Sequence, residues 1–347
     1  MSLYVNPLQV NCIGLGHWGP NLVRTVSEYP HAVVRTLCDV NEQRLKEIVT
    51  RFPKIGEITT DTVKAIKDPQ AHAVVIATPT RTHYELVKTA LLAGKHVLVE
   101  KPLTDRLDQA EELFEIATRL GLTLAVGHVF LFNPGVITVK SLIQSGELGP
   151  IQYIQSTRTN LGPFRTDCNA LWDLASHDIS IINDWLDDLP DSVTAFGKSY
   201  LSPPIEDVVT ASFNYPGGVM ASIHASWLNP CKVRQIVVMG EKRMVVFDDM
   251  NSEHPVTVHN KSAEWLKNPV FASTIREFRS AIPQPEFFFP VVDQSEPLLN
   301  QVHHFLDSLI QGVRPRNCAD LGLNVVRCLD AAERSMKSQS TMMSITR

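Results

Sequence analysis

Gly14-Leu15-Gly16-His17-Trp18-Gly19 follows the short apolar run Val10–Ile13 and precedes a helical pattern. Gly14 permits a tight turn at the end of a strand, Gly16 lets a pyrophosphate approach the backbone, and Gly19 allows the helix to pack closely on the strand. The free N–H groups and positive end of that helix suit a phosphate. A glycine turn without a ligand is the alternative, but the strand–turn–helix context favours a dinucleotide-binding site.

The alternation of strand-like and helical patterns around this motif predicts a Rossmann domain, with a doubly wound parallel sheet, over residues 1–127. Short, almost continuously apolar runs alternate with helical patterns, which is typical of parallel strands covered on both faces. The expected strands are Val10–Ile13, Ala32–Cys38, Ala73–Ala77, His96–Val99 and Leu122–Val126. The expected helices are 20–29, Glu42–Arg51, His83–Leu92 and Leu107–Leu120.

After Gly127 the pattern changes to strand after strand, which predicts a second α/β domain, residues 128–347, with an open, mostly antiparallel sheet. Glycine-rich turns join several of these strands. The expected strands are 153–159, 193–199, 208–215, 219–227, 235–239, 244–248 and 256–259. Among them only 170–186 reads as helical, residues 283–290 read as an extended connector, and two helices, 297–311 and 321–337, close the chain.

Further cofactor contacts are expected at the carboxyl ends of the parallel strands, where ligands bind in such sheets. Asp39 ends the second strand, and a carboxylate there bonds the ribose hydroxyls and repels a 2′-phosphate, which favours NAD over NADP. Nearby Arg44 softens that exclusion, and an ordinary surface aspartate is the alternative reading. The full expected cofactor set is Gly14, Gly16, His17, Trp18, Gly19, Asp39, Thr78, Pro79, His83, Glu100 and Lys101.

Composition excludes several classes of function. The chain of 347 residues is 44% hydrophobic and 20% charged, with a net charge of −5, an ordinary globular balance without the basic footprint of a nucleic-acid or membrane-surface binder. No run of about 18 apolar residues occurs, and the start lacks the pattern of a signal peptide. The six scattered cysteines fit neither a zinc ribbon nor a disulfide scaffold, so we expect no metal and a cytoplasmic location.

Two further motifs supply groups for alcohol and carbonyl chemistry. Lys101, in Glu100-Lys101-Pro102, follows a strand, where its ammonium can stabilise a developing alkoxide. His177 titrates near neutrality and suits proton transfer, and Asp173 lies four residues earlier on the same helix face. A solvated lysine and a surface Asp–His pair are the alternatives.

Together these motifs resemble the glucose–fructose oxidoreductase / inositol dehydrogenase / rhizopine-catabolism (Gfo/Idh/MocA) family over nearly the whole chain. The shared features are the glycine start, Ala77-Thr78-Pro79-Thr80, Glu100-Lys101-Pro102 and the Asp173–His177 pair. The resemblance implies a two-domain enzyme that uses NAD(P) to oxidise a sugar or polyol hydroxyl, with Lys101, Asp173 and His177 as its catalytic residues. The stretch Gly127–Leu131 departs from polyol-oxidising members, which carry basic residues there, and is closer to relatives that act on nucleotide sugars.

A nucleotide sugar would need cations for its diphosphate and polar groups for its hydroxyls. The expected substrate-binding residues are Lys101, Arg158, Asn160, Arg165, Asn169 and Arg234. Surface arginines on strands are an equally good reading of the arginines.

Two other functions use the same motifs. A glycoside hydrolase acting through transient sugar oxidation would release sugar without net NADH, and a non-catalytic NAD sensor would not need Lys101, Asp173 and His177 intact. We also expect a homodimer or homotetramer, because one helical segment covers only one face of the second sheet. The other face is expected to carry Val, Ile and Trp, and large exposed apolar patches mark interfaces.

Overall fold

The computed structural model describes residues 7–52, 55–260, 274 and 286–346, which form two compact units. Unit 1 consists of Met1–Phe132 and Ser295–Asp330, and unit 2 of Asn133–Gln294 and Ala331–Arg347. The change of pattern after Gly127 predicts that every later residue belongs to the second domain. The first unit instead extends to Phe132 and also contains residues 295–330.

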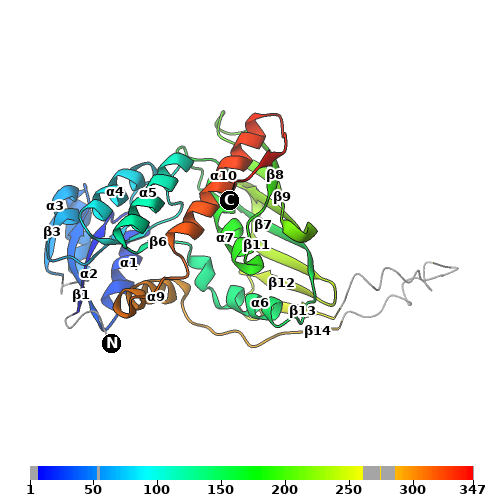
Figure 1. Cartoon of the computed structure of the whole chain (residues 1–347), viewed down its shortest axis with the longest axis horizontal. Coiled ribbons are helices and arrows are strands. Elements are labelled where there is room, and N and C mark those ends of the chain that lie inside the picture. Colours follow the sequence, from blue (N-terminus) through cyan, green and yellow to red (C-terminus); the bar gives the residue numbers. More distant parts are fainter. Residues whose placement is uncertain (1–6, 53–54, 261–273, 275–285, 347) are drawn as a thin grey trace. The chain divides into compact units, whose positions relative to one another are not determined.

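Unit 1 contains a six-stranded parallel sheet in the order β3-β2-β1-β4-β5-β6 (Figure 1). This is the strand order of dinucleotide-binding Rossmann folds, so the predicted fold class is confirmed for this unit. Its apolar strands are buried on both faces, as the near-continuous hydrophobic runs predicted. The strands are β1 (Leu8–Ile13), β2 (Ala32–Cys38), β3 (Glu57–Thr59), β4 (Ala73–Ile76), β5 (His96–Val99) and β6 (Leu124–Val126).

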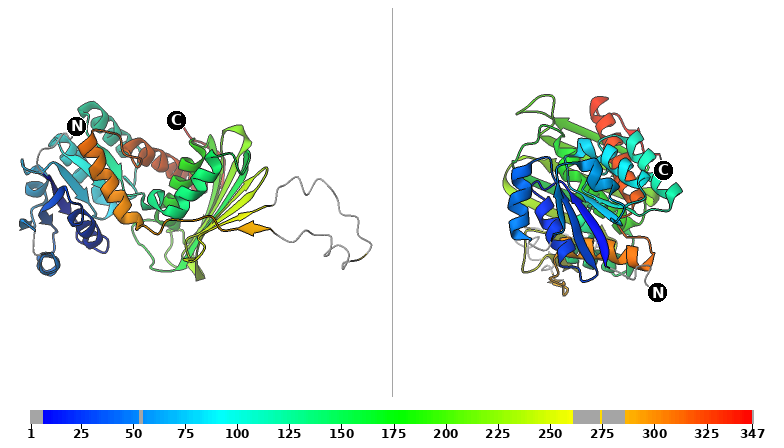
Figure 2. Two further views of the ribbon diagram at one scale, coloured as in Figure 1. Left: turned by 90° about the horizontal axis from the view of Figure 1, so that it is seen from below. Right: turned by 90° about the vertical axis from the view of Figure 1, so that its left-hand side faces the viewer.

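Helices lie on both faces of this sheet (Figure 2). They are α1 (Gly19–Ser27), α2 (Glu42–Arg51), α3 (Thr62–Lys67), α4 (His83–Leu92), α5 (Leu107–Leu120) and α9 (Pro297–Gln311), with short helical turns η1 (Thr80–Thr82) and η2 (Val129–Phe132). The apolar face of α9, including Val302, Phe305 and Leu309, is buried in one cluster with α1 and β1. That shared core explains why α9, although late in the sequence, belongs to unit 1. The strand β3 and the helix α3, with only three and six residues, were not predicted.

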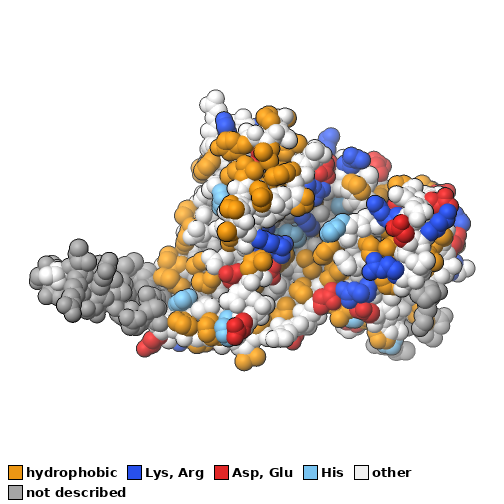
Figure 3. Space-filling model, turned by 180° about the vertical axis from the view of Figure 1, so that it is seen from behind, with side chains coloured by type: hydrophobic (Ala, Val, Ile, Leu, Met, Phe, Trp, Pro, Cys, Tyr) orange, Lys and Arg blue, Asp and Glu red, His pale blue; other side chains and the backbone are white. Residues whose placement is uncertain are grey.

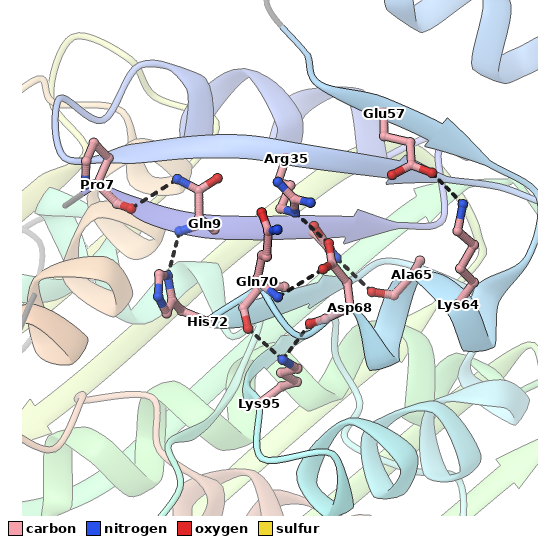
Figure 4. Close-up of polar contacts among 12 residues, drawn as sticks. Pro7, Gln9, Arg35, Glu57, Lys64, Ala65, Asp68, Gln70, His72 and Lys95 are labelled. Atoms are coloured by element: carbon pink, nitrogen blue, oxygen red, sulfur yellow. Dashed lines mark hydrogen bonds and ion pairs between the residues drawn. The ribbon is translucent and has the colours of Figure 1, made fainter.

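Polar contacts fasten the sheet at the edge where its strands begin (Figure 4). The Lys95 ammonium donates to the carbonyls of Asp68 and Ala71 at 2.6 and 2.7 Å, and the Arg35 guanidinium pairs with the Asp68 carboxylate at 2.6 Å. These residues bridge β2, the start of β5 and the turn between α3 and β4. The charged groups at this end of the sheet therefore bind one another, and the glycine turn lies at the opposite end.

Unit 2 contains a nine-stranded sheet in the order β14-β13-β12-β11-β7-β10-β9-β8-β15. Neighbouring strands pair antiparallel except β7 and β10, which are parallel, so the predicted mostly antiparallel sheet is confirmed. All seven predicted strands are present. The strands are β7 (Ile151–Leu161), β8 (Ser192–Lys198), β9 (Val208–Asn214), β10 (Met220–Ser226), β11 (Leu228–Gly240), β12 (Met244–Asp248), β13 (Val256–His259), β14 (Phe287–Phe288) and β15 (Met343–Ser344).

Helices accompany one face of this sheet (Figure 2). They are α6 (Pro134–Gln144), the π-helical turn η3 (Leu171–Ala175), α7 (Ser176–Leu186) and the end of α10 (Ala319–Lys337); a short turn, η4 (Pro216–Gly218), joins β9 to β10. The prediction of a single helix here is wrong, because α6 also packs on β12 and β13. The side chain of Asn133 caps α6 by accepting from Gly135 N at 2.8 Å, a start signal that the sequence contains. Of the predicted connector 283–290, residues 283–285 lie outside the described part of the chain.

The uncovered face of this sheet is mixed rather than strongly apolar. Ile223, Ile236 and Trp227 are buried, at 1% exposure each, so the expectation of Ile and Trp on the open face is wrong. Valines are present there, since Val237 and Val246 are partly exposed and directly paired. Threonine and serine side chains alternate with the buried positions of β9 and β10.

In the view of Figure 3, the charged side chains of one sign do not gather on one part of the surface. On unit 1 the positive and negative side chains are interspersed, and on unit 2 hydrophobic side chains gather over part of the surface. Within the described ranges, no helix is long and apolar enough to cross a bilayer.

Candidate active site

The glycine turn has the geometry that a dinucleotide requires. Gly14 has φ +88°, and a Cβ there would lie 2.6 Å from the carbonyl oxygen of Ala77, so only glycine fits. A Cβ on Gly19 would meet the Gly14 carbonyl oxygen at 2.1 Å, which shows how closely α1 packs on the turn. A Cβ on Gly16, by contrast, would meet nothing within 4 Å. The turn is therefore tight behind Gly14 and Gly19 and open at Gly16, where a pyrophosphate would approach.

Asp39 supports the same turn. Its Oδ2 accepts a hydrogen bond from Leu15 N at 2.6 Å, and its Oδ1 accepts from Asn41 N at 2.8 Å. Arg44 Nη1 lies 3.9 Å from Oδ2. The carboxylate thus sits beside the glycine turn at the carboxyl end of β2, where it can bind a ribose, and it also fixes the backbone of the turn. These residues fit a dinucleotide.

His83, predicted as a cofactor contact, instead braces two backbone segments. Its Nε2 lies 2.9 Å from the carbonyl oxygen of Thr78, and its Nδ1 lies 2.9 Å from that of Pro102. The ring is 1% exposed, and burial lowers the pKa of His83. We therefore treat His83 as a structural residue that joins the turns after β4 and β5, and retain Thr78 and Pro79 as cofactor candidates.

Glu100 and Lys101 follow β5, and the Lys101–Pro102 peptide bond is cis. The backbone N–H of Lys101 donates to the Glu100 carboxylate at 3.3 Å. Desolvation by the surrounding protein raises the pKa of Glu100 to about 7. His128, after β6, is fully buried, and burial together with the Lys101 charge lowers the pKa of His128 to about 3. His128 is thus neutral at physiological pH.

In unit 2, Asp173 lies in the π-helical turn η3, directly before α7. Arg165 Nη1 contacts Asp173 Oδ1 at 3.2 Å, and the indole N–H of Trp227 donates to Oδ2 at 3.1 Å. Both oxygens are therefore held in place, while the side chain is 19% exposed. π-Helical turns occur mostly at functional sites, which is consistent with a fixed but accessible carboxylate.

His177 lies in the first turn of α7, and its helix is tied to the sheet by a buried ion pair. Arg158 of β7 forms two hydrogen bonds of 2.9 Å with Asp178, the residue after His177. Both side chains are almost completely buried, with 4% and 1% exposure. The guanidinium is engaged within the protein, so we do not retain Arg158 as a substrate ligand. Its role is to hold the helix that carries His177.

The other predicted substrate-binding residues are distributed over unit 2. Asn169 accepts from Trp172 N and donates to Glu206, so it starts the helical segment rather than facing a ligand. Arg234 pairs with Asp249 at 3.0 Å, and Asn160 donates to the carbonyl of Gly162. Of the predicted set in this unit, Arg165 contacts the Asp173 carboxylate, and the backbone carbonyl of Asn169 accepts from Asp173 N at 3.1 Å.

Trp227 contributes to the site but is not predicted from the sequence. No local signal marks Trp227, because its contact with Asp173 spans 54 positions and depends on how β10 pairs. In the part of the chain described, no group of three or more His, Cys, Asp or Glu residues is arranged to hold a metal ion. The six cysteines are all free thiols.

The strand order and the glycine turn, with Asp39 beside it, are those of a dinucleotide-binding Rossmann fold. Residues 8–128 match the oxidoreductase family with an NAD-binding Rossmann fold, and residues 136–246 match the GFO/IDH/MocA C-terminal domain. The chain therefore belongs to the Gfo/Idh/MocA oxidoreductase family, as its motifs indicated.

Relatives include a dehydrogenase of a cyclic polyol and a dehydrogenase of a nucleotide sugar. The chain is 25% identical to the NADP-dependent scyllo-inositol 2-dehydrogenase of Bacillus subtilis, with 98% of this chain and 96% of the relative covered. It is 26% identical to the UDP-N-acetylglucosamine 3-dehydrogenase of Acidithiobacillus ferrooxidans, with 79% and 88% covered. A crystal structure from Magnetospirillum magnetotacticum MS-1 superposes with a TM-score of 0.78 at 30% identity, covering 94% of this chain and 99% of that one.

Proposed function

We propose that the protein is an NAD-dependent dehydrogenase that oxidises a ring hydroxyl of a sugar, or reduces the corresponding keto sugar. The observation that carries the proposal is the preorganised Asp173 in η3, held by Arg165 and Trp227 four residues before His177. A carboxylate fixed at both oxygens beside an acid–base side chain suits proton transfer from a hydroxyl. We find no comparable support for acyl or phosphoryl transfer.

The chemistry divides between the cofactor and the protein. Oxidation of a secondary alcohol removes a hydride from carbon and a proton from oxygen; NAD, when bound, accepts the hydride. His177 takes the proton, and Asp173 orients the imidazole or binds a substrate hydroxyl. The Lys101 ammonium stabilises negative charge that develops on the reacting oxygen. Lys101 belongs to unit 1, whereas Asp173 and His177 belong to unit 2. The proposed role of Lys101 and that of His177 are therefore tested by separate variants.

The cofactor preference follows from Asp39. Its carboxylate is held by Leu15 N and Asn41 N, so it cannot turn away from a ribose without breaking both bonds. A 2′-phosphate there would meet a fixed negative charge, which favours NAD. The partly exposed Arg44 limits the discrimination.

We extend the substrate class to nucleotide sugars because one relative is a UDP-N-acetylglucosamine dehydrogenase. Arg165, 31% exposed, and Arg234, 35% exposed, are the remaining cations for a diphosphate, since Arg158 is buried. A diphosphate would compete for them with Asp167, which binds Arg165 at 2.7 Å, and with Asp249, which binds Arg234 at 3.0 Å. UDP- and dTDP-sugars should be compared with free inositols and hexoses by following NADH, with a keto acid added in case the cofactor stays bound. Turnover of free polyols alone would remove the nucleotide-linked class. Glycoside cleavage without net NADH would identify a hydrolase, and NADH binding without turnover would favour a sensor.

A further inference from the structure

The residue before Asp173 is anchored from outside the turn η3. The indole N–H of the buried Trp172 donates to Glu333 Oε2 at 2.5 Å, across 161 positions of the chain. Glu333 lies in the part of α10 that belongs to unit 2, so both partners are in the same unit. The acceptor is a carboxylate, and a hydrogen bond to a charged acceptor is about twice as strong as a neutral one.

The end of α10 that carries Glu333 is itself fixed on the sheet of unit 2. Two residues further on, the fully buried Ser335 accepts a hydrogen bond from Ala195 N of β8 at 2.9 Å. A Cβ on Gly197, also in β8, would lie 2.8 Å from the sulfur of Met336, which shows how closely this part of the helix packs. The Trp172 indole is therefore bonded to a rigid support and not to a mobile surface group.

We propose that Glu333 is a positioning residue that holds η3, through Trp172, and thereby sets the place of the Asp173 carboxylate. Trp172 and Asp173 are consecutive, with Cα atoms about 3.8 Å apart, so a shift of Trp172 carries Asp173 with it. Arg165 and Trp227 hold the two oxygens of that carboxylate, whereas Glu333 holds the backbone that presents it. The value of this anchor for catalysis rests on the role proposed above for Asp173, but the anchor itself does not.

The anchor can be tested without any substrate. In protein labelled with a heavy nitrogen isotope in tryptophan, the indole resonances of Trp172 and Trp227 are each identified by their loss in the corresponding Trp→Phe variant. Glu333→Ala removes the acceptor of Trp172 and should shift that resonance. It should also shift the resonance of Trp227, because Trp227 donates to Asp173 and reports any movement of that carboxylate. The Trp185 resonance is the control and should stay in place, since its N–H donates to a backbone carbonyl of α6.

Two results of this experiment would overturn the proposal. A Trp172 resonance that is unchanged in Glu333→Ala would exclude the hydrogen bond. A shift of Trp172 with no shift of Trp227 would mean that Glu333 only satisfies a buried N–H and does not position Asp173.

Kinetics test whether the anchor serves the reaction. Glu333→Ala should lower kcat about tenfold, the scale of one lost hydrogen bond to a charged group, while the substrate KM changes by less than about twofold. Glu333→Gln should recover most of the lost kcat, because its amide oxygen can accept the same hydrogen bond. Lys337→Ala is the matched control: it removes the 2.5 Å ion pair at Glu333 Oε1 but leaves Oε2, and kcat should stay within about twofold of the wild type.

An equal fall of kcat in Glu333→Ala and Lys337→Ala, or a Glu333→Gln variant as slow as Glu333→Ala, would overturn a role through the Trp172 hydrogen bond. If Glu333→Ala keeps the wild-type kcat on a sugar that is oxidised, the positioning role fails and the proposed oxidoreductase stands. If no sugar is oxidised, the proposed function fails, and the Trp172 and Trp227 resonances still decide whether Glu333 holds Asp173 in place.

Discussion

Two buried tryptophans of unit 2 provide a matched test of the Asp173 assignment. Trp227 and Trp185 are 1% and 2% exposed, and each indole N–H donates one hydrogen bond. Trp227 donates to the Asp173 carboxylate at 3.1 Å, and Trp185 donates to the Val136 carbonyl at 2.9 Å. Replacing either residue with phenylalanine removes that bond and trims the same part of a buried ring.

The two variants should therefore be similar in stability and different in activity. A hydrogen bond to a charged group contributes about 1.5–3 kcal/mol and a neutral one about 0.5–1.5 kcal/mol, so each protein should lose roughly 1–3 kcal/mol of unfolding free energy. In Trp227→Phe the loss also frees Asp173 to move, which should lower kcat about tenfold or more. In Trp185→Phe, kcat should stay within about twofold of the wild type.

Denaturant unfolding and steady-state kinetics, measured on both variants with the best substrate from the screen, check this expectation. Equal kcat in Trp227→Phe and Trp185→Phe, at comparable stability, would refute a catalytic role for a positioned Asp173. A similar fall of kcat in both variants would mean that activity depends on the stability of unit 2 and not on the Trp227–Asp173 hydrogen bond.

Four further expectations follow from the structure. NADH should bind more tightly than NADPH in a fluorescence titration, because Asp39 is fixed beside the glycine turn; equal or tighter NADPH binding contradicts that role. Lys101→Ala and His177→Ala should each lower turnover by about 100-fold or more while NADH affinity changes little, and activity within a few-fold of the wild type would remove the assignment. The folded-state pKa of Glu100 is raised from 4.5 to about 7, so the native state binds the extra proton and the wild type should lose up to about 3 kcal/mol of stability as pH rises through this window. Glu100→Gln should flatten that loss in denaturant unfolding at either end of the window, and parallel curves would be inconsistent with a desolvated Glu100. Light scattering at micromolar concentration should show a homo-oligomer, because the open face of the second sheet still exposes the paired Val237 and Val246 in part; a monomer would rule it out.

The parts of the fold that can be predicted from the sequence are those set by residues close together in the chain. Strands of unit 1 are apolar runs bounded by turns, and the glycine motif requires both Gly14 and Gly19 for steric reasons that hold in any such turn. The helix α6 was overlooked although Asn133 and Pro134 form a recognisable helix start. Its residues lie between β6 and β7, and the strand patterns on both sides conceal its helical pattern.

What the sequence could not predict depends on pairing between distant segments. Arg158 reads as an exposed strand arginine until β7 is placed against α7, where Asp178 binds it in the interior. Likewise His83 has a helix-start pattern, yet its buried ring lies between two carbonyls from separate turns. In each case a polar residue that looked available to a ligand is satisfied by a partner that only tertiary structure supplies.

For the open face of the second sheet, apolar residues that were expected to be exposed are buried. Period-two alternation shows that two faces differ, but not which face the helices cover. Ile223, Ile236 and Trp227 proved to be on the buried side, and the open side carries Val237 and Val246 with threonine and serine.

The central claim, hydride transfer between a sugar carbon and NAD, is tested most directly by isotope transfer. A sugar or nucleotide sugar that gives turnover would be prepared with deuterium on the carbon bearing the reacting hydroxyl and incubated with the enzyme and NAD. The account predicts that mass spectrometry finds the deuterium in NADH, or in the reduced keto acid if the cofactor stays bound, with transfer reduced about 100-fold in His177→Ala. Product that forms with the deuterium still on the sugar, or lost to water, would contradict it.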